Sequence, residues 1–252
     1  DDNEVLKTPH IFLDEIMRQA KESEIIQLTM DIRAGKPLKL FQGQEVQIID
    51  KKDLVSGMLL WADQIICAKN ETRKNINNLM RTYLHGDNAK KNILLDGDKV
   101  ICLRNYWDIF SEHGDVLVNG SIGYVYDISE RKSKHPLVKN YLSCDFLPEF
   151  YSEEEAEDSF FDLYFRRLGL DKKLLKDGEA TVNKTNFKRI PQEEKPFEFD
   201  YGYCITCWKA QGSEFDKVLV FEEDFPFNKD EHIRYLYTAA TRARKKLIIV
   251  RK

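Results

Sequence analysis

Two short polar stretches near the C-terminal end of the chain contain the residue types that phosphate chemistry uses. The first is the turn KAQGSE at 209–214, which lies between two apolar, strand-like runs, Tyr201–Thr206 and Lys217–Phe221. A strand that ends in a glycine-containing polar loop is where α/β sheets place nucleotide and phosphate chemistry. The second stretch, Tyr235–Arg244, predicts a short helix carrying hydroxyls and arginines. A guanidinium group suits phosphate oxygens because it is planar and stays charged.

The elements that would position these stretches alternate between strand and helix patterns. Apolar residues recur at helical spacing from Phe12 to roughly Ala34, where Gly35-Lys36-Pro37 ends the run. The patterns that follow predict strand 45–50, helix 53–62, strand 64–68 and helix 72–84, and a closing strand at 246–250. This βα rhythm predicts an α/β fold with a parallel sheet and flanking helices.

Around residue 87 the pattern changes to short strands joined by Gly/Asn turns, at 97–104, 115–120 and 122–128. This is typical of a small β-barrel. We expect Trp107 in the barrel core and a type I′ turn at Asn119-Gly120. Further on, an amphipathic helix is expected at 160–168, after the acidic run 153–158. Residues 131–195 as a whole are assigned no activity.

Composition bounds these expectations. The chain has 252 residues, of which 42% are hydrophobic and 12% aromatic, so it can form a real core as one large domain or as a domain with an insert. The net charge of −4 excludes only a uniformly basic coat and leaves room for local phosphate-binding patches. The sequence shows neither a membrane span nor a signal peptide, which predicts a cytoplasmic protein without a membrane partner.

The five cysteines, at positions 67, 102, 144, 204 and 207, are expected to be buried thiols. Cys204 and Cys207 have CxxC spacing, but no second ligand pair accompanies them. Residues three apart on a strand face opposite sides, which is wrong for zinc, so we expect no metal site.

The stretches 203–216 (YCITCWKAQGSEFD) and 235–244 (YLYTAATRAR) resemble motifs V and VI of superfamily 1 helicases. They are most similar to the RecD/Dda branch, superfamily 1B, whose members translocate 5′→3′ and carry a UvrD/RecD-like helicase C-terminal domain. Trp208 stands where that family usually has His. A further stretch, LDEIMRQA at 13–20, resembles motif IV.

The resemblance implies roles for individual residues. Arg242 would be the arginine finger and Arg18 its motif IV partner at the ATP γ-phosphate; Glu214 and Gly212 would lie near the nucleotide, and Tyr237 would line either the ATP or the domain interface. Thr206, Lys209, Gln211 and Ser213 would sense the DNA backbone. The segment from Ile65 to Asn77 resembles the family's DNA-facing segment, with Lys69, Asn70, Arg73 and Asn77 as candidate contacts. An ordinary polar helix start explains these four residues equally well.

The β region resembles the SH3-like insert of the same branch, which packs beside single-stranded DNA. Its candidate contacts are Asn105, Tyr106, Trp107 and Asn119, because exposed aromatic rings can stack on bases. The implied fold is a RecA-like parallel sheet interrupted by an SH3-like β-barrel insert. The expected division is 1–87 and 196–252 for the second RecA-like domain and 88–195 for the insert.

The chain contains no GxxxxGK[ST] sequence, no strand ending in Asp-Glu for Mg²⁺ and no GDxxQ sensor. The resemblance therefore implies a C-terminal half of an ATP-dependent 5′→3′ DNA helicase, inactive alone. A first RecA-like domain, expected before residue 1, would complete the site for ATP with Mg²⁺. Its other expected partners are single-stranded DNA and proteins of replication, repair or recombination. Two alternatives stay open: a non-catalytic nucleic-acid-binding module, and an assembly subunit of a RecBCD-like helicase–nuclease.

Overall fold

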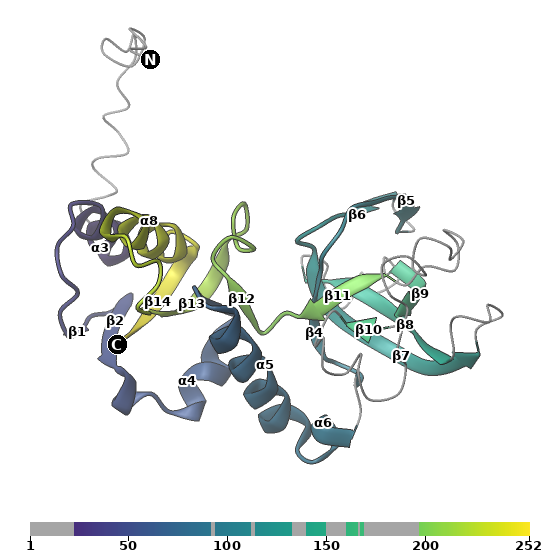
Figure 1. The fold of residues 1–252 in the computed structure, drawn as a ribbon. Helices are drawn as coiled ribbons and strands as arrows, with labels where there is room; N and C mark the ends of the chain where they lie inside the picture. Colours follow the sequence, from purple (N-terminus) through teal and green to yellow (C-terminus); the bar gives the residue numbers. More distant parts are fainter. Residues whose placement is uncertain are drawn as a thin grey trace, which may run out of the picture. The chain divides into compact units, whose positions relative to one another are not determined.

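The computed structural model describes residues 23–91, 94–111, 114–132, 140–149, 160–165, 167–168 and 197–252. The chain packs as two compact units (Figure 1). Unit 1 runs to Asn70 and resumes from Thr206 to Lys252, and unit 2 comprises Glu71–Ile205. The division at 87/88 and 195/196 expected from the sequence stays a prediction.

Unit 1 is organised around a sheet whose central strands are parallel. Its strand order is β1 (Phe41–Gln42), β2 (Val46–Asp50), β14 (Ala243–Arg251), β13 (Phe215–Phe221), β3 (Gln64–Cys67) and β12 (Cys204–Thr206). Strands β2, β14, β13 and β3 pair in parallel, and β1 pairs antiparallel with β2. The runs Val218–Phe221 and Leu247–Val250 are entirely buried, as expected for parallel strands covered on both faces.

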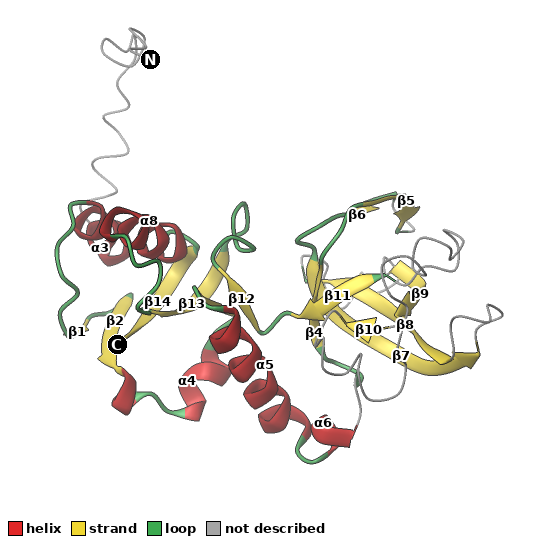
Figure 2. Ribbon diagram, viewed as in Figure 1, coloured by secondary structure: helices red, strands yellow, loops and turns green. Residues whose placement is uncertain are grey.

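Helices cover this sheet. Helices α3 (Glu24–Arg33) and α8 (Lys229–Ala240) pack against each other and on β14, while α4 (Ser56–Trp61) packs on β13 from the other side (Figures 1 and 2). The short 3₁₀ helix η1 (Lys51–Asp53) precedes α4. Helix α3 buries Ile25, Thr29 and Ile32, one stripe at helical spacing. The predicted α/β fold with a parallel sheet and flanking helices is confirmed.

Three predicted helices of unit 1 have the wrong extent. The helix predicted over Tyr235–Arg244 is α8, which ends at Ala240, so Arg242 and Arg244 lie after it. A helix continuous from Phe12 to Ala34 is excluded, because Ser23 has extended backbone angles and caps α3, its Oγ accepting from the backbone N–H of Ile26. The predicted helix at 53–62 is only α4, which ends at Trp61.

Unit 2 joins a helix to a largely antiparallel sheet. Helix α5 (Asn70–His85) and the short α6 (Asn88–Lys91) come first. The sheet order is β10 (Arg167–Leu168), β11 (Glu198–Tyr201), β4 (Lys99–Cys102), β7 (Ile122–Lys132), β8 (Asn140–Pro148) and β9 (Phe160–Phe165). Strands β5 (Tyr106–Phe110) and β6 (Val116–Leu117) form a separate ribbon. The expected β region is present here, and its assignment as an SH3-like barrel stays a prediction.

Several local predictions in unit 2 were wrong. Residues 160–165 and 167–168 form β9 and β10, although a helix was expected there. Trp107 is 67% exposed rather than in a core. A type I′ turn needs positive φ at both central residues, but Gly120 has φ 96° and Asn119 does not have a positive φ. The run 201–206 is divided between β11 and β12.

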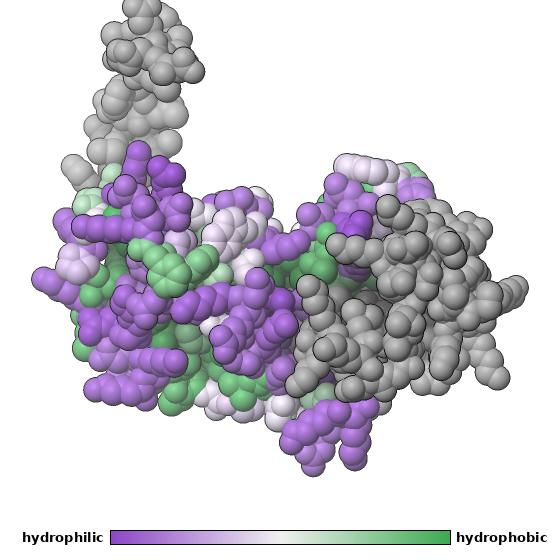
Figure 3. Space-filling view, viewed as in Figure 1, coloured by the Kyte–Doolittle hydropathy of each residue, from purple (hydrophilic) through white to green (hydrophobic). Residues whose placement is uncertain are grey.

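Hydrophilic side chains cover much of the visible face over the described elements, with hydrophobic groups showing between them (Figure 3). None of the helices in the ranges that the structure describes is long and apolar enough to cross a membrane.

Candidate functional site

Arg242 lies two residues after the end of α8 and immediately before β14. Its Nε donates to the carbonyl oxygen of Thr238 at 3.1 Å, and its Nη2 donates to Thr241 Oγ1 at 3.1 Å. Its Nη1 reaches out of the helix and donates to the carbonyl oxygen of Ser213 at 3.1 Å. The guanidinium fork has more N–H donors than these three acceptors use. The side chain is therefore held in one orientation while retaining donors for a phosphate.

The polar turn after β12 is a compact loop fixed at both ends. Its first half is a helical turn, in which the backbone N–H groups of Lys209 and Ala210 donate to the carbonyl oxygen of Thr206 at 2.8 and 3.2 Å. Gly212 then has φ 88°, and no atom lies near the position of a Cβ there. The loop returns to the sheet where the Phe215 N–H donates to the Arg242 carbonyl oxygen at 2.8 Å. The polar loop and the residues that follow α8 therefore meet within unit 1.

The sequence-predicted residues around this contact differ in exposure. Gln211, Gly212 and Glu214 are exposed, whereas Lys209, Ser213 and Tyr237 are half-buried and Thr206 is buried. Arg18 lies outside the described residues.

A charged group adjoins the start of β13. Asp216 forms ion pairs with Lys245 and Arg244, each at 2.7 Å. The hydrogen bond from Lys245, and next the charge of Arg244, hold the pKa of the Asp216 carboxyl below its ordinary value. Arg244 therefore pairs with Asp216, whereas Arg242 binds the polar loop through Ser213.

Lys69 and Asn70 follow the end of β3, where a carboxylate from the loop after β13 binds the backbone. Glu223 Oε2 accepts from the N–H groups of Ala68 and Lys69 at 2.6 and 2.9 Å. The backbone of Cys207 also donates to the carbonyl oxygen of Cys67 at 3.0 Å, which places the start of the polar loop beside this strand end.

Two of the predicted contacts in α5 are engaged within unit 2. Arg73 Nη1 forms an ion pair with Asp200; burial raises the pKa of the Asp200 carboxyl, and the charge of Arg73 opposes that shift. Asn77 is 2% exposed, and its Nδ2 donates to the carbonyl oxygens of Tyr201 and Cys204 at 3.2 and 2.9 Å. Its Oδ1 accepts from the Cys204 N–H at 2.8 Å. The Asn77 amide is therefore committed to the backbone between β11 and β12.

The candidate contacts of the β region are arranged around a loop. Asn105 Oδ1 accepts from the N–H of Asn119 at 2.8 Å, so the side-chain oxygen of Asn105 has a structural role. The Tyr106 hydroxyl accepts from the Glu198 N–H at 2.7 Å. Burial raises the pKa of Tyr106 to about 12.

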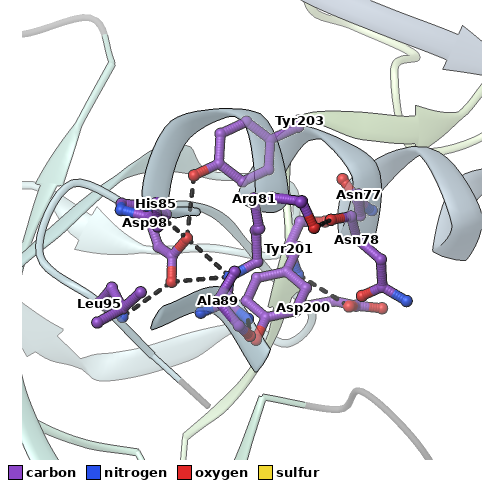
Figure 4. Close-up of polar contacts among 11 residues, drawn as sticks. Asn77, Asn78, Arg81, His85, Ala89, Leu95, Asp98, Asp200, Tyr201 and Tyr203 are labelled. Atoms are coloured by element: carbon purple, nitrogen blue, oxygen red, sulfur yellow. Dashed lines mark hydrogen bonds and ion pairs between the residues drawn. The ribbon is translucent and has the colours of Figure 1, made fainter. Parts of the chain in front are cut away.

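Sequence reasoning missed a buried polar cluster that joins α5 to β4 and the segment before β12 (Figure 4). Asp98 is fully buried and accepts from Arg81 Nε at 2.9 and 3.1 Å, from the Tyr203 hydroxyl at 3.0 Å and from the Leu95 N–H at 2.8 Å. Arg81 also lies over the Tyr201 ring, 4.4 Å from its centroid. A buried charge needs such partners, but no local pattern indicates which distant residues supply them.

All five cysteines are free and buried, which confirms the expected thiols. Burial raises the pKa of Cys207 to about 11. Within the ranges described above, no group of His, Cys, Asp and Glu residues could hold a metal ion.

Residues 201–250 match the family model of the UvrD-like helicase C-terminal domain. This range contains the polar loop, α8 and Arg242. No curated protein sequence matches the chain.

Among solved structures, the chain is similar to a Pif1 helicase from Candida albicans, at 15% identity and a TM-score of 0.48, covering 92% of this chain and 54% of that one. A Bacteroides Pif1 helicase in complex with ADP-AlF3 and ssDNA aligns at 15% identity and a TM-score of 0.45, covering 90% of this chain and 49% of that one. The chain spans about half the length of these structures.

Proposed function

We propose that this chain is the second RecA-like half of an ATP-dependent 5′→3′ DNA helicase or translocase. The observation that carries the proposal is the hydrogen bond from Arg242 to Ser213, inside the segment that matches the helicase family model. This hydrogen bond joins Arg242, the proposed γ-phosphate contact, directly to the proposed DNA-sensing loop. A change in either can therefore be transmitted to the other through one guanidinium group.

On the nucleotide side, Arg242 is the proposed arginine finger, with Arg18 as its partner. Phosphoryl transfer depends mainly on positioning and on neutralising charge at the γ-phosphate. The retained donors of the Arg242 fork and the open space at Gly212 fit a phosphate and a closely approaching ligand. Glu214 is exposed and can accept hydroxyl protons from the nucleotide sugar, and Tyr237 would line the same side. ATP with Mg²⁺ would be held mainly by a first RecA-like domain.

On the nucleic-acid side, the proposed contacts come from the polar loop and from the end of β3. Lys209, Gln211 and Ser213 lie in the loop, Thr206 begins it, and Lys69 and Asn70 follow β3. Such donors suit a phosphate backbone without reading sequence. Arg73, Asn105 and Asn119 are proposed as further contacts from unit 2. For Asn77, which is buried, we propose a structural role that supports the backbone between β11 and β12.

The test compares ATP hydrolysis by residues 1–252 with hydrolysis by a polypeptide that adds a first RecA-like domain carrying GxxxxGK[ST]. We expect no turnover by the chain alone, and turnover stimulated by single-stranded DNA when the added domain is present. Arg242→Ala should abolish the latter, whereas Arg244→Ala should leave most of it. Turnover by the isolated chain, or turnover insensitive to Arg242→Ala, would contradict the proposal. DNA binding with no ATP dependence in any context would favour a non-catalytic binding module or an assembly subunit.

A further inference from the structure

Three aromatic side chains gather where the polar loop leaves the sheet. The Trp208 and Phe225 ring centroids are 6.3 Å apart, and those of Phe225 and Phe227 are 5.7 Å apart. Trp208 is 53% exposed and Phe227 is 85% exposed, while Phe225 is half-buried between them. We call these three residues the aromatic ledge. Adjacent aromatic rings that are exposed to solvent form an apolar surface patch, and such patches indicate a binding site.

The ledge is held by ordered structure on both sides. Trp208 lies in the helical turn that is fixed by the bonds from Lys209 and Ala210 to Thr206. Phe225 and Phe227 lie in the loop after β13. Glu223 lies in the same loop, and its carboxylate binds the backbone after β3. Next to it, Asp224 forms an ion pair with Lys252 at 2.6 Å. The rings are therefore presented on fixed supports, which lowers the entropy lost when a flat ligand stacks on them.

We propose that the aromatic ledge is a stacking platform for bases of single-stranded nucleic acid, with Trp208 as the ring that contacts the base. This rests on the proposed function, and adds base contacts to a loop so far assigned only to the backbone. Trp208 lies between Thr206 and Lys209 in that loop, so a strand whose phosphates lie along it has bases within reach of the ring. Stacking tolerates any sequence, because every base has a π-face.

The charges around the ledge restrict how a strand can lie. The loop after β13 and the first turn of α8, residues 222–231, are together rich in carboxylates. Of these, Glu222 lies 3.6 Å from His232, and Asp224 is paired with Lys252. Phosphates are therefore disfavoured at the Phe227 end and favoured at Lys209 and Lys69. A base, which is uncharged, can still occupy the ledge. A basic, apolar protein segment is the competing occupant that the same charges would admit.

The experiment measures binding of residues 1–252 to two oligonucleotides of equal length, oligo(dT) and a fully abasic strand with the same phosphates. We expect Trp208→Ala to weaken oligo(dT) binding roughly tenfold or more and to leave abasic binding and the salt slope unchanged. Trp208→Phe should restore most of the affinity, because it restores a ring. Phe41→Ala removes a comparably exposed ring from β1 and should have no effect.

The outcomes separate this inference from the proposed function. If wild-type protein binds oligo(dT) but Trp208→Ala binds both strands as wild type does, the stacking platform is wrong and the helicase proposal stands. Equal losses for oligo(dT) and the abasic strand would also overturn stacking, since they indicate a lost backbone contact. Binding of a Lys/Leu-rich peptide that is abolished by Trp208→Ala, with oligo(dT) binding unchanged, would assign the ledge to a protein partner. Failure of wild-type protein to bind any single strand would overturn both.

Discussion

Arg242 and Ser213 are joined by a hydrogen bond of 3.1 Å from Nη1 to a backbone carbonyl oxygen, so a residue between α8 and β14 supports the loop before β13. The Phe215 N–H returns a bond of 2.8 Å to the Arg242 carbonyl oxygen. Two segments 29 residues apart in sequence are thereby joined by one side-chain bond and one backbone bond.

Arg242→Ala is expected to loosen the loop 207–214 without unfolding the sheet. The side-chain bond to Ser213 is lost, whereas the backbone bond from Phe215 and the pairing of β13 with β14 remain. Hydrogen exchange at Ala210 and Ser213 should become faster, while exchange within Val218–Phe221 should stay as slow as in wild type. Arg242→Lys should restore little protection, because Lys lacks the fork that reaches several acceptors. Arg244→Ala is the matched control, and equal loosening in that variant would contradict the assignment.

Asn77→Ala should destabilise unit 2 by about 2 kcal/mol or more, because it leaves buried backbone groups of Tyr201 and Cys204 without their partner. Asn78→Ala, one residue along α5 and exposed, is expected to change stability little. Urea unfolding of both variants measures the difference. Similar midpoints for the two variants would mean that the Asn77 amide is replaceable by water.

Gly123→Ala should be poorly tolerated. A Cβ at this position would meet the carbonyl oxygen of Leu147 and the Cα of Pro148 in the paired strand β8, which are backbone atoms and cannot move aside. Overpacking of this kind costs about 1–3 kcal/mol. Gly57→Ala in α4 is the control, since its Cβ meets no atom and should even stabilise the helix slightly. Thermal melting of the two variants should shift in opposite directions.

The contribution of Glu24 to stability should depend on pH. Its carboxylate accepts from the N–H groups of Glu45, Gln44 and Val46, and these bonds, that of Glu45 first, lower its pKa. A lowered folded-state pKa gives stability that is present above the ordinary pKa of Glu and lost as the pH falls through the folded value. Glu24→Gln should therefore melt below wild type at neutral pH and approach it in acid. Glu71→Gln, at an exposed helix start, is the control and is expected to change the melting temperature at neutral pH little.

The sequence predicted the parallel strands well because β3, β13 and β14 are short apolar runs of the kind that are buried on both faces. It also predicted a helix over Tyr235–Arg244, but α8 ends at Ala240, so Arg242 lies after the helix. The Ser213 contact could not be read from spacing. The run FFDLYF at 160–165 was predicted to be helical because the acidic run 153–158 precedes it, but its aromatic enrichment favours a strand. The pairing of Arg81 with Asp98 depends on tertiary packing, so no local signal indicates it.

The interior position of Asn77 bears on how this chain could be re-engineered. Its amide ties the helix through which the polypeptide enters unit 2 to the short segment through which it leaves. A chimera that exchanges the β region for another module would have to keep Asn77 and the backbone segment that it binds. The exchanged residues must therefore lie between Asn77 and Tyr201. A graft that also replaced Asn77 and the 201–204 segment would remove these native hydrogen bonds, and would test whether the parallel sheet of unit 1 forms without them.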